Sequence, residues 1–286
     1  MKTSLRILTL AIALSSSVAL ITACKKDSSS SNNSADNGSA ANMSANGATS
    51  DNAYDDVSNL AIQTGYDKNI DNLMQKRNGS GTLGYNFCAA VSVSGGTFPV
   101  TLTVDFGSGC TSVDGISRSG SITYIFSGRL STPGTTVSAT FNNYVVNGYH
   151  LGGTYSIQNN STTSFSLKTT VTDGTITYPT DSSYSFSGTK TATMVSGNIT
   201  DPSTLVFNIT GNYTVTNTNT GESLSAATTT ALERKETCLH VDKGIVGFTY
   251  TKGNLSAKGT LDYGDGTCDD SALITIGAFT KTITLP

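Results

Sequence analysis

The sequence of 286 residues is poor in the side chains that most often build catalytic and metal sites. It has no tryptophan, two histidines and only 13% charged residues. Its glutamates are confined to one stretch, at Glu222, Glu233 and Glu236. The motifs Gly-x-Ser-x-Gly and His-Glu-x-x-His and a phosphate-binding glycine loop do not occur, which excludes the enzyme classes that depend on them. His150 and His240 have too few potential co-ligands for a metal site, so surface or packing roles are expected.

The chain also has no excess of positive charge. Its 17 lysines and arginines are outnumbered by 20 aspartates and glutamates, which gives a net charge of −3. This mild acidity argues against nucleic acid or an anionic membrane surface as a partner. After residue 23 no apolar run is long enough to cross a bilayer as a helix, so membrane attachment would depend on a covalent lipid.

The N-terminal residues have the pattern of a bacterial lipoprotein signal peptide. Two basic residues precede an apolar run at 7–21, which has the length of a signal-peptide core and is short for a transmembrane helix. The sequence Ile-Thr-Ala-Cys at 21–24 then forms a lipobox. We therefore expect residues 1–23 to be removed and Cys24 to carry acyl chains such as palmitate, which anchor the protein to a membrane.

Residues 24–50 are predicted to be a lipidated flexible tether. They are small and polar, with Met43 as the one large apolar side chain, so they bury too little surface to offset the entropy of ordering. A short helix and a connection are expected over 51–84, with Asp51 as the N-cap and Gly65 as the stop. The apolar face of this helix would consist of Tyr54, Val57, Leu60 and Ala61.

From residue 85 to 286 the sequence alternates between apolar and polar residues. The alternation is clear at 100–105, 137–141, 165–171 and 205–209, and it is typical of antiparallel strands with one buried face. Dipeptides that favour turns separate such segments: Gly95-Gly96, Asn147-Gly148, Asp173-Gly174 and Lys252-Gly253. We expect an all-β fold, an antiparallel meander of many short strands. It would form a sandwich or a large curved open sheet, with one short N-terminal helix.

Four cysteines remain besides the lipid site. An exported chain meets an oxidising compartment, where an even number of cysteines predicts two disulfides. Of the three possible pairings, the two that are local in sequence, Cys88–Cys110 and Cys238–Cys268, are favoured. Each would contribute about 3–4 kcal/mol by constraining the unfolded chain. The alternative is that some of these thiols are buried and free.

Two of the cysteines end a repeated motif. The first copy reads Thr-Val-Asp-Phe-Gly-Ser-Gly-Cys at 103–110, and the second reads Thr-Leu-Asp-Tyr-Gly-Asp-Gly-Thr-Cys at 260–268. Both begin as an alternating strand and end in Asp-aromatic-Gly-x-Gly before the cysteine. We interpret them as related, disulfide-stapled turns at the two ends of the β domain.

These turns and the anchor carry a family resemblance. The relevant residues are Lys-Lys-Asp after the lipobox, the stretches at 105–110 and 114–120, and Asp-Tyr-Gly-Asp-Gly-Thr-Cys-Asp at 262–269. They resemble uncharacterised outer-membrane lipoproteins of the Bacteroidota, over the anchor and about 88–148 and 236–286. The resemblance implies an outer-membrane location and an all-β fold, and it transfers no catalytic residue.

The acidic residues of the second turn are a weak candidate metal site. Calcium prefers several oxygen ligands on a flexible loop, and Asp262, Asp265, Asp269 and Asp270 would supply them. Their spacing does not fit an EF-hand, because position 273 is leucine. Aspartate and glycine are also the usual residues of tight turns, and that interpretation is favoured. No cofactor is expected.

Other polar and aromatic residues also have a structural and a functional interpretation. Arg118 is expected to pair with a nearby aspartate rather than with a ligand. Four tyrosines, if exposed, would form a sugar-stacking platform, although cross-strand packing is favoured. These tyrosines are Tyr144, Tyr149, Tyr178 and Tyr184.

The favoured function is a non-catalytic, membrane-anchored lipoprotein of the outer membrane that serves as an envelope or surface interaction module. It would face the periplasm or the cell surface and bind a glycan or protein partner. The alternatives are a glycan-binding module beside a surface uptake system, a hydrolase with two carboxylates facing across a cleft, and an assembly subunit that pairs through open edge strands.

Overall fold

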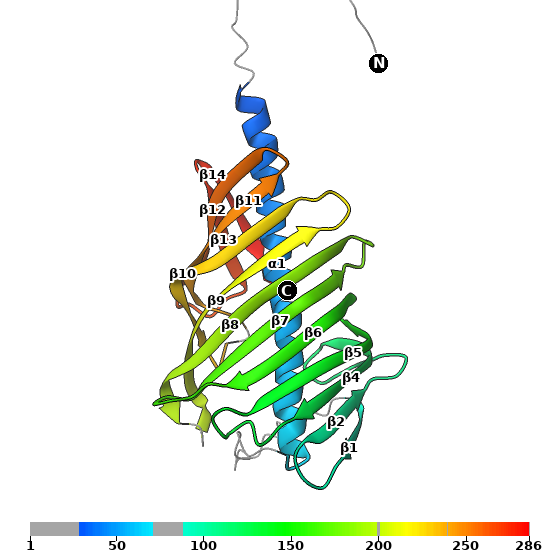
Figure 1. The fold of residues 1–286 in the computed structure, drawn as a ribbon. Coiled ribbons are helices and arrows are strands. Elements are labelled where there is room, and N and C mark those ends of the chain that lie inside the picture. The colour runs from blue at the N-terminus through cyan, green and yellow to red at the C-terminus, as the bar shows by residue number, and fades with distance from the viewer. Residues whose placement is uncertain (1–28, 71–87, 199–200, 239, 286) are drawn as a thin grey trace, which may run out of the picture.

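The computed structural model describes residues 29–70, 88–198, 201–238 and 240–285, where the chain forms one helix and one sheet (Figure 1). The predicted signal peptide, lipobox and Cys24 lie outside these residues. The helix α1 is Ser29–Asp67. The strands are β1 (Ala90–Ser94), β2 (Val100–Asp105), β3 (Cys110–Thr111), β4 (Ser117–Phe126), β5 (Thr136–Val146), β6 (Tyr149–Asn159), β7 (Ser166–Thr177), β8 (Ser183–Asn198), β9 (Asp201–Asn217), β10 (Ser223–Lys235), β11 (Lys243–Lys252), β12 (Leu255–Asp265), β13 (Ser271–Ile276) and β14 (Phe279–Thr284).

The strands lie in the sheet in chain order. The order is β1-β2-β4-β5-β6-β7-β8-β9-β10-β11-β12-β13-β14, and the two-residue strand β3 pairs with β4 beside this path. Each strand pairs antiparallel with its neighbours. The predicted antiparallel meander is therefore confirmed, and it is an open sheet rather than a sandwich.

Interior bulges bend the strands. Register shifts interrupt β4 at Gly120 and β6 at Gly153, where φ is +71° and +92°. The carbonyl oxygens of Asn143 and Asp173 on the adjacent strands leave no room for a Cβ at these two glycines. Bulges of this kind bend a strand and increase its twist, and the sheet curves round α1 (Figure 1).

The predicted turns are mostly placed correctly. Gly95-Gly96 lies between β1 and β2, Asn147-Gly148 between β5 and β6, and Gly253 between β11 and β12. The turn predicted at Asp173-Gly174 is wrong, because this dipeptide lies inside β7, where Asp173 has a φ of +50°. A bulge and a tight turn both require positive φ, and Asp and Gly tolerate it in either setting.

The helix begins at Ser29, so the flexible tether predicted for 24–50 is wrong from residue 29 onward. The 39 residues of α1 also make it much longer than the short helix expected. Ala40 and Ala41 are fully buried, and the backbone at Gly47 lies directly against the ring of Tyr213. Small side chains give such a segment little apolar surface of its own, but they also let a curved sheet approach it closely.

The ends of α1 differ from those predicted. Asp51 is an interior helical residue rather than the N-cap, and the helix continues past Gly65 to Asp67. Asn69, with a φ of +57°, then closes it, and the N–H of Ile70 donates to the carbonyl of Gly65 at 2.9 Å. Within the part of the chain that is described, no helix carries an apolar stretch that would cross a bilayer.

The core lies between α1 and the concave face of the sheet. The predicted helix face of Tyr54, Val57, Leu60 and Ala61 is buried there, which confirms that part of the sequence pattern. The Tyr124 hydroxyl of β4 donates to the carbonyl of Val57 at 2.9 Å. The Tyr54 hydroxyl donates to the carbonyl of Gly152 at 2.8 Å. Tyrosines on the sheet therefore donate hydrogen bonds to the helix backbone, and a tyrosine on the helix donates to the sheet backbone.

Candidate functional site

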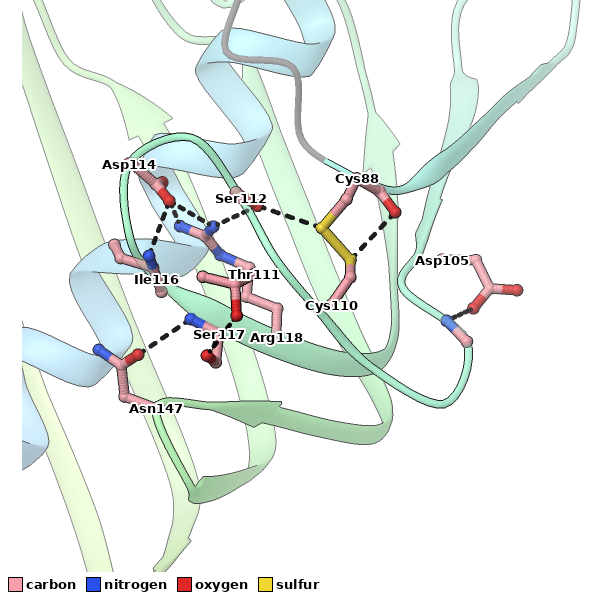
Figure 2. The surroundings of a disulfide bond; sticks show 11 residues. Cys88, Asp105, Cys110, Thr111, Ser112, Asp114, Ile116, Ser117, Arg118 and Asn147 are labelled. Carbon is pink, nitrogen blue, oxygen red and sulfur yellow. Dashed lines mark hydrogen bonds and ion pairs between the residues drawn. A yellow bond between two sulfur atoms is a disulfide. The ribbon is translucent and has the colours of Figure 1, made fainter.

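The first cysteine turn joins the residues before β1 to β3 (Figure 2). Cys88 and Cys110 form a disulfide with their Cα atoms 6.1 Å apart. The Asp105 carboxylate accepts a hydrogen bond from the N–H of Gly107 at 2.8 Å. This bond closes a tight turn at the end of β2, where Gly107 has a φ of +56°.

The second cysteine turn repeats this arrangement near the other end of the sheet. Cys238 and Cys268 form a disulfide with a Cα separation of 5.7 Å, so the favoured pairing is confirmed for both pairs. Asp262 accepts from the N–H of Gly264 at 3.0 Å, as Asp105 does in the first copy. The two motifs therefore share a local structure as well as a sequence.

The acidic side chains of the second turn stabilise turns. Each of three aspartates, Asp262, Asp265 and Asp269, accepts from the backbone N–H two residues later, at 2.8–3.1 Å. The hydroxyl and N–H of Thr267 lower the pKa of Asp265. The described ranges contain no group of three or more His, Cys, Asp or Glu side chains that could hold a metal ion, and this includes these three aspartates and Asp270.

Arg118 of β4 forms a buried ionic network beside the first turn (Figure 2). Its Nη2 lies 2.5 Å from Oδ1 of Asp56 on α1 and 2.9 Å from Oδ2 of Asp114, and its Nη1 donates to Ser112. The Tyr144 hydroxyl donates to Oδ2 of Asp56 at 2.5 Å. Burial alone would lower the pKa of Arg118, but the two carboxylates more than offset it and raise that pKa. The expected pairing with an aspartate is confirmed.

A second ionic network, which is half-buried, was not expected from the sequence. Lys190 Nζ on β8 lies 2.8 Å from Asp51 and 2.7 Å from Asp55 of α1. Burial lowers the pKa of Lys190, and the carboxylates raise it above its ordinary value, whereas burial raises the pKa of Asp51. The spacing of Asp51 and Asp55 was a signal for this network, because residues four apart share a helix face. The predicted tether ended at residue 50, so Asp51 was assigned as the N-cap and not as an interior residue of that face.

The four tyrosines considered for a sugar platform do not form an exposed row. Tyr144 and Tyr184 are buried, and Tyr149 and Tyr178 are half-buried with their rings edge to face at 5.0 Å. The Tyr178 hydroxyl donates to the carbonyl of Asn46 at 2.8 Å, and the amide of Asn46 donates to Tyr184. The packing interpretation is confirmed, and the platform is excluded because these rings attach α1 to the sheet.

A cavity of about 580 Å³ lies between the second half of α1 and the concave face of β6–β9. This volume is within the usual range of small-molecule sites. His240 lies at it, half-buried, while His150 is exposed on β6. The sequence does not indicate this cavity, because the helix and strand residues that line it are far apart in the chain. Its apolar lining includes Ile157, Phe165, Leu167, Ala192, Met194 and Phe207.

Comparison of the chain with protein-family models, with curated proteins and with solved structures gives no match. The geometry separates two kinds of polar group. The charged side chains of Arg118 and Lys190 are used in binding α1 to the sheet. Arg118 and Lys190 also line part of the cavity, whose other walls present side chains that do not complete a packed core, and the cavity is the candidate functional site.

Proposed function

We propose that this chain is a non-catalytic lipoprotein of the bacterial outer membrane, anchored through acylated Cys24, and that it serves as a binding module of the cell envelope. The observation that carries the proposal is the lipobox at 21–24 behind an apolar signal-peptide core. The cavity beside α1 supports the binding role, because its volume suits a small ligand.

The state of the buried carboxylates supports a role without catalysis. Asp56 is held by Arg118, and Asp242 is held by Lys235 at 2.9 Å. A general acid or a nucleophile must be able to give up a proton or attack a substrate atom. A carboxylate fixed in a buried ion pair is poorly suited to either task, so these residues favour a structural role.

The start of the helix adds a geometric argument for the anchor. Ser29 follows Cys24 by five positions, and five extended residues reach at most about 17 Å. The first turns of α1 extend beyond the strands in Figure 1. In the anchored protein α1 itself would therefore connect the lipid to the sheet, in place of a long flexible tether.

The anchor is tested by the Cys24→Ala variant expressed in its native envelope. We expect it to lose incorporation of labelled palmitate and to leave the membrane fraction, because acylation would be its only attachment there. The Cys110→Ser variant is the matched control, since it loses a disulfide and should keep both the label and the membrane association. A Cys24→Ala protein that stayed in the membrane fraction would contradict the proposal.

A hydrolase is the second candidate, because one pair of acids lies close together. Asp51 and Asp55 both contact Lys190, and Asp55 and Lys190 both line the cavity. Burial raises the pKa of Asp51, as is common for an acid catalyst. The ammonium group between the two carboxylates argues against this role. Turnover of a glycoside panel that Asp55→Asn abolished would establish it.

A further inference from the structure

The cavity beside α1 has two chemically different walls. The sheet wall is formed mostly by aliphatic and aromatic side chains from β6–β9, with Leu167, Met194 and Phe207 among them, and Thr169 and Lys190 are its polar members. The helix wall is formed largely by hydroxyl and amide side chains, including Ser58, Asn59 and Gln63. A site built from these walls suits a molecule with one apolar part and one hydrogen-bonding part.

The sheet wall is unlike the core on the other face of the helix. Leu167, Met194 and Phe207 are only half-buried, whereas Val57 and Leu60 are fully buried against the sheet. Polar residues on α1 face this apolar wall, so the two surfaces do not pack against each other. An apolar group bound here would cover the side chains that the helix leaves exposed.

The charges around the cavity favour an uncharged ligand. Arg118 is paired with Asp56 and Asp114, and Lys190 is paired with Asp51 and with Asp55 of the lining. Arg234 and Glu236, the remaining oppositely charged pair in the lining, lie 4.0 Å apart. A charged head group would have to be desolvated while the lining charges already have partners, which is unfavourable.

The position along α1 favours a ligand that reaches the site through water. Thr49, the first lining residue of the helix, is twenty residues after Ser29, which is about 30 Å at the rise of an α-helix. In the anchored protein the cavity would lie well away from the lipid attached to Cys24. A single-chain amphiphile has enough solubility as a monomer to cross that distance, whereas a two-chain lipid stays in its bilayer.

We propose that this cavity binds one molecule of a neutral, single-chain amphiphile. Its chain lies on the wall formed by β7–β9, and its hydroxyl or amide head group lies toward Asn59 and Gln63 of α1. The inference deepens the proposed function, since it gives the binding module a site and a class of ligand. It does not depend on the anchor for its test, so the two can fail separately.

The absence of tryptophan makes a direct test possible, because one introduced indole is the only such fluorophore. The full chain carrying Cys24→Ala receives either Met194→Trp, in the cavity wall, or Val195→Trp. Val195 is the matched control: it is the next residue of β8, is 51% exposed and does not line the cavity. The probe is a monoacylglycerol with a dibrominated chain, added below the concentration at which it aggregates.

We expect saturable quenching of the Met194→Trp protein and at least tenfold weaker quenching of the Val195→Trp protein. The same brominated chain bearing a carboxylate or an amine head group should need at least tenfold higher concentration. Adding Leu167→Arg to the Met194→Trp chain should remove the quenching, whereas Ile125→Arg, on an exposed side chain of β4, should not. Thermal unfolding and free-thiol titration check that each variant folds.

Several results would overturn the proposal. Equal quenching of the two indoles would show adsorption to the surface, and no quenching of either would show that the chain does not enter the cavity. Equal affinity for the charged amphiphiles would remove the argument from charge. Prevention of quenching by a soluble oligosaccharide or by a second copy of the chain at high concentration would identify a different occupant.

Discussion

At the residue scale, the molecule is distinguished by charged side chains that connect the sheet to its helix. Arg118 is 3% exposed and connects β4 to α1 through Asp56, and the half-buried Lys190 connects β8 to the same helix. Burying a charge costs several kcal/mol, about as much as a good ion pair returns. Such pairs therefore add little net stability, but they select the position of α1 that satisfies them.

The Arg118→Ala variant should be strongly destabilised. It leaves Asp56 buried without its cation, and losing one partner of a buried pair costs about 3–5 kcal/mol in the free energy of unfolding. Arg234→Ala is the control, because that side chain is 29% exposed, lies 4.0 Å from Glu236 and should cost less than about 1 kcal/mol. Urea unfolding measures both variants. Similar losses in the two variants would contradict the buried network.

At the scale of elements, α1 shows why a segment can be helical without an amphipathic pattern. Its first half is rich in Ala, Ser, Asn and Gly, of which only alanine strongly favours a helix. The sheet supplies the stability by enclosing the segment, with Ala40, Ala41 and Gly47 at its closest approach. Helices in proteins generally depend on such tertiary packing more than on propensity.

Alanine substitutions at two glycines of α1 distinguish a helix enclosed by the sheet from a flexible tether. A Cβ at Gly47 would lie 2.8 Å from the Tyr213 ring, whereas a Cβ at Gly38 would meet nothing within 4 Å. Gly38→Ala should therefore stabilise the protein by up to about 1 kcal/mol through helix propensity alone. Gly47→Ala should lose that gain and become destabilising, because the Tyr213 ring packs on Phe186 and has to shift.

Thermal and urea unfolding of the full chain measure this difference in stability. If both substitutions left the free energy of unfolding unchanged, the segment would behave as the tether that the sequence suggested. If both stabilised the chain equally, the segment would be helical but would not be packed against Tyr213. We expect the two substitutions to change the free energy of unfolding in opposite directions.

At the scale of the whole molecule, tyrosines join the single helix to most of the sheet. Among the described residues, burial raises the pKa of nine tyrosines, which lie on α1, β4–β6, β8, β9, β11 and β12 or in the loop between β7 and β8. For Tyr250 the pKa rises to about 12, through burial and the neighbouring Glu222 carboxylate. The neutral phenol is the form that the folded state requires.

This arrangement predicts a loss of stability at alkaline pH. A group whose pKa is raised by folding contributes stability that is complete below its unfolded value, about 10 for tyrosine, and is lost as the pH rises above it. Ultraviolet absorbance should therefore show most tyrosines ionising above about pH 10 together with unfolding, as followed by circular dichroism. Without tryptophan, the tyrosinate signal is easily separated. Ionisation of most tyrosines near pH 10 in a folded chain would contradict the burial.

The sequence by itself determined the strands and the cysteine turns. Alternation at 100–105 and 205–209 fixes which side chains face inward, because successive residues of a strand point to opposite faces. The repeated Asp-aromatic-Gly motif is a local structure, since Asp105 and Asp262 bond to N–H groups two residues away. The order of strands also follows from the chain, because short connections favour antiparallel neighbours.

Tertiary structure alone decided the position of α1, the partners of its aspartates and the cavity. Residues 29–50 carry too little apolar surface to indicate burial, and only the curved sheet buries Ala40, Ala41, Met43 and Ala48 of this helix. Asp173 and Gly174 are residue types that favour a turn. They form a bulge here because the neighbouring strands pair with β7 on both sides of this dipeptide. The curvature of the sheet and its enclosure of α1 result from many strands acting together, and no local sequence pattern encodes them.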